Sequence, residues 1–270
     1  YFKTENPLNN LIINHSSAVV NLAGNPDDLK CEGDLTITAG TLKSTNSGAT
    51  LDVDGDASVT GTLDWSGTSG GAVELGSLTI PSGGTYSATS GTTTIKGNAS
   101  SSANLAWANS GTFTHNSGTV LFDGTNTFGG SSFGHINPAT NTFNNLTINA
   151  DSKVLQLRGN STTLTVAGDL TMTDGTLMNY GTDTVTTTVT GHVSIANGAT
   201  LGANTGGNDM TAPLNFGSLT IDSGGTFIAT TGTTTITDET TIQRDRYNYS
   251  IIPSAPSPQK WSDCNDWQRP

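Results

Sequence analysis

The chain has 270 residues, of which 12% are charged and 6% aromatic, with a formal net charge of −12. Such an acidic protein repels phosphate backbones, which excludes nucleic acid as the expected partner. No apolar run approaches the roughly 18 residues of a membrane-spanning helix, so no membrane span is expected. Gly, Thr, Ser and Asn fill most other positions. Apolar residues alternate with them in short runs, which predicts ordered strands with one wet face rather than disorder.

The N-terminal segment, residues 1–28, contains two strand candidates, at 11–13 and 18–22, followed by a turn at 25–28. Residue 1 is Tyr rather than Met, and no signal-peptide pattern follows it. We therefore expect a processed protein or a fragment of a longer chain.

Short repeats follow between residues 33 and 97. A Gly-x-apolar-Thr/Ser-Ile/Val phrase, followed by Gly-Thr-Leu/Tyr, starts at positions 33, 55 and 76. A strand at the first phrase would turn Leu35 and Ile37 inward and the intervening threonines outward. The period of roughly 21 to 26 residues is typical of one solenoid turn, with glycine at the corners.

Residues 107–124 have a different pattern. Two short strands, 112–115 and 119–122, are joined by Asn-Ser-Gly, which suits either a hairpin or a further solenoid corner. A Gly- and Ser-rich connection at 128–137 precedes the next repeats.

The second part of the chain repeats the first in order. Residues 9–14 return as 144–149, residues 33–38 as 168–173, and residues 76–86 as 217–227. The sequence therefore predicts two duplicated solenoid halves, 1–140 and 141–242.

The last 28 residues, 243–270, differ from the rest because they contain four of the nine prolines and two of the four tryptophans. The end of a solenoid exposes unpaired strand edges, so we expect this tail to be a cap or a docking segment. Its aromatic residues are the candidate assembly contacts: Tyr247, Tyr249, Trp261 and Trp267. Cys31 and Cys264 are the only cysteines, and the sequence leaves open whether they are free thiols or a disulfide.

The predicted fold class is all-β, with a parallel β-helix as the favoured architecture. Parallel strands usually form continuous apolar runs. A solenoid permits alternation because one face of each strand lines the core and the other meets water. Tandem antiparallel β-sandwiches are the alternative, since short alternating strands fit them as well.

Two phrases, Gly-Asp-Leu-Thr-Ile-Thr-x-Gly-Thr-Leu at 33 and Gly-Thr-Phe-Thr-His-Asn-Ser-Gly-Thr-Val-Leu-Phe-Asp-Gly at 111, resemble those of bacterial surface and phage virion β-helix repeat proteins. Autotransporter passengers, filamentous adhesins and phage fibres belong to that group. The resemblance covers roughly residues 8–242 and implies a right-handed parallel β-helix outside the cell, on a cell or virion surface. It transfers no catalytic residues.

The densest group of carboxylates is Asp52, Asp54 and Asp56. Alternate spacing along a strand would put three oxygen donors on one face, which suits Ca²⁺. The matching positions in the second half are Thr188, Thr190 and His192, so the fold does not need acids there. The alternative is a solvated acidic edge, and no other cofactor is expected.

Trp65 and Trp107 are candidate stacking surfaces for a glycan. The four histidines lie far apart in the sequence, and no active-site motif is present. We therefore expect a non-enzymatic structural or adhesive rod that assembles with itself or with other appendage or virion subunits. The alternatives are a tailspike-like polysaccharide-degrading enzyme and a glycan-binding module.

Overall fold

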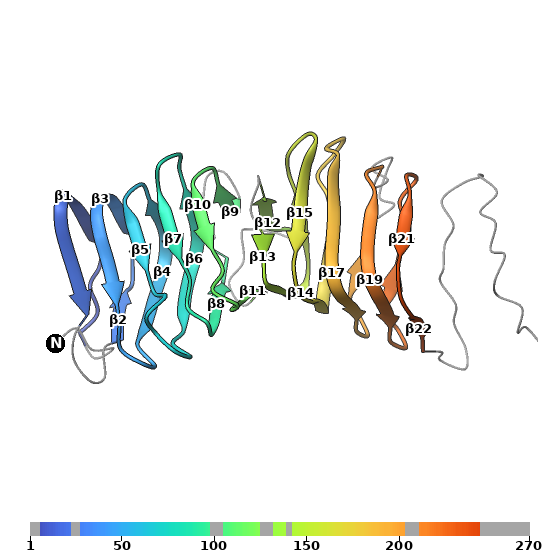
Figure 1. Ribbon diagram of the computed structural model, residues 1–270, viewed down its shortest axis with the longest axis horizontal. Helices are drawn as coiled ribbons and strands as arrows, with labels where there is room; N and C mark the ends of the chain where they lie inside the picture. The colour runs from blue at the N-terminus through green and yellow to red at the C-terminus, as the bar shows by residue number, and fades with distance from the viewer. Residues whose placement is uncertain are drawn as a thin grey trace, which may run out of the picture.

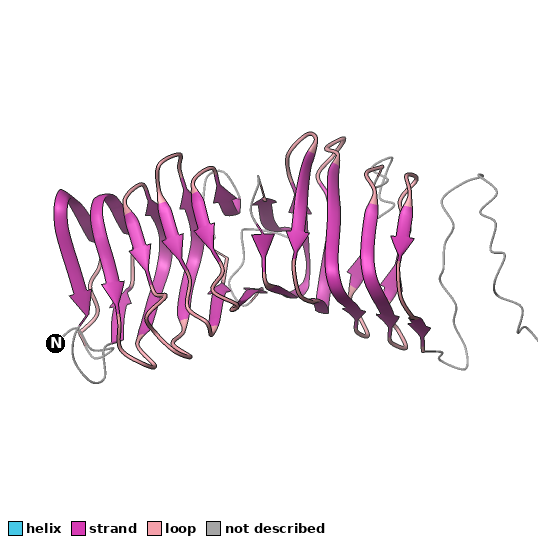
Figure 2. Ribbon diagram, in the orientation of Figure 1, coloured by secondary structure: helices cyan, strands magenta, loops and turns pink. Residues whose placement is uncertain are grey.

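The protein is an all-β rod in which the chain winds as a parallel β-solenoid of about nine turns (Figure 1). The computed structural model describes residues 6–22, 28–97, 105–124, 132–138, 142–202 and 211–243. Across these ranges the secondary structure consists of strands, turns and loops, with no helix (Figure 2). Every strand pairing within them is parallel, which rules out the antiparallel sandwiches.

The strands of the N-terminal part are β1 (Leu11–Leu22), β2 (Asp28–Cys31), β3 (Leu35–Ser44), β4 (Thr50–Val59), β5 (Thr62–Asp64), β6 (Val73–Ile80), β7 (Thr85–Ser87), β8 (Thr92–Ile95), β9 (Leu105–Asn109), β10 (Thr112–Thr114) and β11 (Thr119–Asp123). The strands of the C-terminal part are β12 (Ser132–Asn137), β13 (Thr142–Phe143), β14 (Asn145–Leu157), β15 (Thr162–Val166), β16 (Leu170–Asn179), β17 (Val185–Ile195), β18 (Thr200–Leu201), β19 (Leu214–Ile221), β20 (Thr226–Phe227), β21 (Thr234–Ile236) and β22 (Thr240–Ile242).

Each turn has three faces, which we number from the first complete turn. Face 1 begins with β2, face 2 with residues 35–37 of β3, and face 3 with residues 41–44 of β3. Each segment pairs with the segment about one turn further along the chain: residues 28–31 pair with 50–53, and 41–43 with 62–64. Several strands bend around a corner and contribute to two faces, as the register shift between Val53 and Asp56 in β4 shows.

The core is a narrow column of apolar side chains along the axis of the rod. Burial alternates along β4, where Leu51, Val53 and Ala57 point inward. Leu35 and Ile37 are likewise buried, and Thr36 between them is only partly covered. The predicted inward and outward positions are thus confirmed, since a strand alternates its side chains between two environments.

Residues 107–124 form a corner of the coil rather than a hairpin. Strand β10 pairs with β7, whereas β11 pairs with β8 and β14. Asn116 and Ser117 between them have φ of 46° and 61°, and the amide of Ser117 donates to Nδ1 of His115 at 3.0 Å. These left-handed residues turn the chain from face 3 to face 1.

The two sequence halves form one continuous stack, but they are out of phase by one face. The phrase at Gly33-Asp34 leads into residues 35–37 on face 2. Its copy at Gly168-Asp169 leads into residues 170–172, which pair with residues 146–148 on the preceding turn. Following the pairings further back, through 120–122 and 93–95, leads to strand β6 on face 1, so residues 170–172 lie on face 1. The chain around the predicted boundary, residues 139–141, and the tail from 244 onward lie outside the described residues. Because of this shift by one face, the same corner phrase occupies different corners of the rod in its two halves.

Candidate functional site

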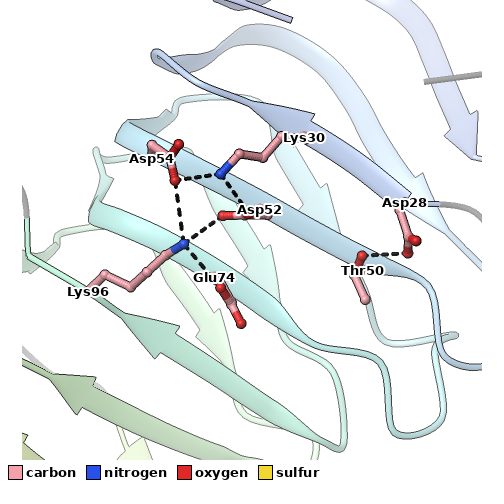
Figure 3. A network of polar contacts seen from close by, with 7 residues as sticks. All are labelled: Asp28, Lys30, Thr50, Asp52, Asp54, Glu74 and Lys96. Carbon is pink, nitrogen blue, oxygen red and sulfur yellow. Dashed lines mark hydrogen bonds and ion pairs between the residues drawn. The ribbon is translucent and has the colours of Figure 1, made fainter. Parts of the chain in front are cut away.

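A network of charged side chains lies on the outside of face 1 near the N-terminal end (Figure 3). Lys30 Nζ is 2.7 Å from Asp52 Oδ2 and 2.5 Å from Asp54 Oδ1. Lys96 Nζ is 2.6 Å from Asp52 Oδ1 and 3.0 Å from Glu74 Oε2. The five residues come from β2, β4, β6 and the end of β8, so the network ties four successive turns together.

The solenoid geometry places these side chains next to one another. Lys30 is opposite Asp52, and Asp52 is opposite Glu74, because each pair occupies the same register position on adjacent turns. Lys30 and Asp52 are 22 residues apart, and Lys96 lies 44 residues from Asp52. Both lysine side chains are mostly covered, at 17% and 14% exposed, with their amines held among carboxylates.

The network shifts the ionisation of its members. Burial lowers the pKa of Lys30 and of Lys96. The hydrogen bonds and negative charges of Asp52 and of a second carboxylate, Asp54 for Lys30 and Glu74 for Lys96, together outweigh burial, so both pKa values lie above the ordinary 10.5. Burial raises the pKa of Asp52, but the hydrogen bonds and positive charges of the two lysines together outweigh burial, so the pKa lies below the ordinary 3.8. Lys30, Lys96 and Asp52 are therefore charged near neutral pH.

The three aspartates that the sequence singles out do not share one face. Asp52 and Asp54 contact the two lysines, but the corner at Asp54 and Gly55 carries Asp56 onto face 2, where its Oδ1 accepts a hydrogen bond from Ser77 Oγ at 2.5 Å. Across the described part of the chain, no group of three or more His, Cys, Asp and Glu side chains is placed to hold a metal ion. Calcium binding stays a prediction, and lysine amines occupy the space beside Asp52 and Asp54.

Asp56 belongs to a different arrangement, a ladder of hydrogen bonds along one corner of the rod. Asn10 Oδ1 accepts the amide of Asp34 at 2.7 Å, and Asp34 Oδ1 accepts the amide of Asp56 at 2.8 Å. The recurring Gly-Asp phrase is explained by this ladder, because glycine leaves room for the side chain of the preceding turn: a Cβ on Gly55 would lie 2.3 Å from Asp34 Oδ1.

An equivalent ladder runs along another corner in the second half. Asn145 Oδ1 accepts the amide of Asp169 at 3.0 Å, and Asp169 Oδ1 accepts the amide of His192 at 2.8 Å. His192 Nδ1 is 2.7 Å from Ser218 Oγ. This corner leads onto face 1, whereas the first ladder leads onto face 2, in keeping with the shift between the halves.

Trp65 and Trp107 are both fully buried, at 0% exposed, so neither indole offers a stacking face to a glycan. Both positions correct the expectation that these rings meet solvent. Trp107 lies in an aromatic cluster at the junction of the two halves. Its ring centroid is 4.9 Å from that of Phe113 and 5.2 Å from that of Phe143, and these rings fill the core where the repeat changes phase.

The remaining candidates divide between the core and the tail. Cys31 is a buried free cysteine, and burial raises the pKa of its thiol. Cys264 and the four candidate assembly residues (Tyr247, Tyr249, Trp261 and Trp267) lie outside the described residues.

Sequence reasoning missed the role of Lys30 and Lys96. The signal was available, because stepping 22 residues back from Asp52 arrives at Lys30, and stepping 44 forward arrives at Lys96.

No protein-family model matches the chain, and neither the search of curated proteins nor that of solved structures returned a match. Among the described residues, no helix is both long and apolar enough to cross a membrane. What the structure establishes is a parallel β-solenoid with internal repeats.

Proposed function

We propose that this protein is a non-enzymatic structural rod that forms part of an extracellular appendage, a filament or a virion fibre. The observation that carries the proposal is that polar side chains link successive turns of the rod. The ion pairs on face 1 and both corner ladders connect one turn to the next along the axis. Side chains committed in this way stiffen a stack of turns.

The backbone supports the same role. Strands run across the rod and their ladder hydrogen bonds run along it, so bending the rod must stretch many bonds at once. The outward positions of the strands are mainly hydroxyl and amide residues, which keep a long rod hydrated without a large apolar face.

Immunogold electron microscopy of the source cells or particles tests the proposal. An antibody against residues 6–243 should label filaments or fibres outside the cell or on the virion. Label confined to the cell interior would overturn it.

The enzymatic alternative is separated by incubating the purified chain with surface polysaccharides and measuring released reducing ends. We expect no release above the heat-treated protein. Release that one Asp substitution abolishes would replace the rod with a polysaccharide-degrading enzyme.

A further inference from the structure

One cationic side chain in the second half lies over an aromatic ring at the surface. The guanidinium carbon of Arg158 lies 4.2 Å from the centre of the Tyr180 ring. The two residues follow the paired positions Leu157 and Asn179 on adjacent turns of face 2, and the amide of Tyr180 donates to the carbonyl of Leu157 at 2.8 Å. The solenoid register therefore fixes the stacking.

The N–H groups of this guanidinium make no hydrogen bond or ion pair within the part of the protein that the structure describes. Lys30, Lys96 and Lys153 each contact a carboxylate, whereas no such ion pair is found for Arg158 among the described residues. The nearby acid, Asp183, has another role, because its Oδ2 accepts the amide of Gly159 at 2.9 Å. A guanidinium carries five N–H donors, so one that lies over a ring without an ion pair can still make a planar, two-pronged contact with a carboxylate.

The surroundings hold the pair in place before any ligand arrives. Asp183 ties the corner after Arg158 to the turn after Tyr180, and the amide of Ser161 donates to Thr184 Oγ1 at 3.2 Å. The rings of His135 and Tyr180 are packed nearly perpendicular to each other, with centroids 4.8 Å apart and planes at 79°. A site whose groups are already positioned loses less entropy on binding.

His135 also contributes to the electrostatics of this surface. It is 7% exposed, and its buried Nδ1 has no hydrogen-bond partner in the described structure. Burial and the charge of Arg158 lower the pKa of His135, with Asp183 opposing. Its ring is therefore neutral at pH 7 and adds no second positive charge beside Arg158.

We propose that Arg158 and Tyr180 form a binding site for a carboxylate-bearing sugar, with His135 positioning the tyrosine. The N–H groups of Arg158 would take the carboxylate. Arg158 lies over the ring of Tyr180, and the part of Tyr180 that stays exposed, 38%, would contact the sugar ring beside it. The net charge of −12 opposes dense polyanions such as acidic peptides or nucleic acids. A saccharide with at most one carboxylate on each ring has the favourable group without that repulsion.

Calorimetric titration of the purified full chain tests this site directly, whatever structure the rod belongs to. The probes are a disaccharide of glucuronic acid, the matching disaccharide of glucose, and tetraglutamate. We expect binding of the first alone. Replacement of Arg158 by Gln (Arg158→Gln) should weaken it by about tenfold or more, because a charge-assisted contact is lost.

Lys43→Gln is the matched control, since it removes one positive charge from face 3 and should leave the affinity unchanged. Tyr180→Ala should weaken binding, and circular dichroism melting shows whether each variant is folded. Three results would overturn the proposal: no binding of the acidic disaccharide, equal binding of glucose disaccharide or tetraglutamate, or an equal loss in Lys43→Gln.

Discussion

The ion pairs on face 1 show how single side chains contribute to the rod. Lys96 is held by Asp52 and Glu74 and is only 14% exposed, which makes it the most covered amine of the network. Its removal leaves Glu74 without a cation and leaves Asp52 paired with Lys30 alone. We expect Lys96→Met to lower the free energy of unfolding by about 1–2 kcal/mol.

Urea unfolding followed by circular dichroism measures this change. Lys43→Met is the control, because Lys43 makes no ion pair within the described residues, and it should cost less than about 0.5 kcal/mol. The difference between the variants should shrink in 1 M salt, which screens partly exposed pairs. Equal losses in the two variants at low salt would show that the network does not stabilise the fold.

The same network predicts how stability depends on pH. Folding lowers the pKa of Asp52, so its pairing stabilises the protein above pH 3.8 and is lost as the pH falls through the lower, folded value. Folding raises the pKa of Lys96, so its contribution is complete below pH 10.5 and is lost as the pH rises through the higher, folded value.

The network's contribution should therefore be flat between about pH 5 and pH 9. Asp52→Asn should reduce the loss of unfolding free energy between pH 5 and pH 2, compared with the natural protein. If both proteins lost the same free energy of unfolding between pH 5 and pH 2, the pairing of Asp52 would be contradicted.

Among the strands, most of the coil could be predicted because its signal is local. Alternation assigned Leu35 and Ile37 to the core, and the Gly-Asp phrases marked the corners. Alternation also predicts the burial of Trp65, which lies two residues after the buried Leu63, although the sequence analysis did not use it. Trp107 lies in the run Leu-Ala-Trp-Ala, where apolar and polar residues do not alternate, so its side could not be predicted in this way. The contact between Lys30 and Asp52 could be predicted from their separation of 22 residues, because residues one turn apart in a solenoid lie side by side.

Corner glycines should differ in cost according to what surrounds them. Gly40 in β3 has φ of 91°, and a Cβ there would lie 2.6 Å from the carbonyl oxygen of His15 on the preceding turn. Gly48 has φ of 78°, but a Cβ there meets nothing within 4 Å. We expect Gly40→Ala to cost about 2–4 kcal/mol and Gly48→Ala about 1 kcal/mol.

Thermal and urea unfolding of the two alanine variants measure this contrast. A positive φ is common to both sites, so the difference reports on the close approach of turns alone. Similar losses at the two positions would mean that adjacent turns are not packed as closely as the structure has them.

For the rod as a complete object, the tail is the part whose role remains a prediction. Residues 243–270 follow β22, whose strand edge ends the described stack. We expect deletion of 243–270 to change the association state, because the tail would cap that edge or dock on another subunit. Sedimentation velocity of the full and shortened chains measures this, and an unchanged mass would remove the tail from the account of assembly.

The phase shift between the halves could not be read from the repeats. A repeat gives the order of strands along the chain, but the face on which a copy lies depends on how many segments the connection between the halves contributes. That connection, around residues 97–141, departs from the repeat pattern. The duplicated phrases are therefore equivalent in local structure, such as the Asp34 and Asp169 ladders, and not in position around the axis.

Disulfide trapping across the junction tests this arrangement most directly. Leu121 of β11 and Thr147 of β14 lie opposite each other on the outside of face 1. Opposite residues on adjacent parallel strands have a Cα separation that a disulfide can span. In a Cys264→Ser background, Leu121→Cys with Thr147→Cys should oxidise readily to an intramolecular bond detectable by mass spectrometry. If the two halves were in phase, residue 147 would lie on face 2, beside residue 137. A disulfide that forms in Asn137→Cys with Thr147→Cys, and not in Leu121→Cys with Thr147→Cys, would contradict the structure.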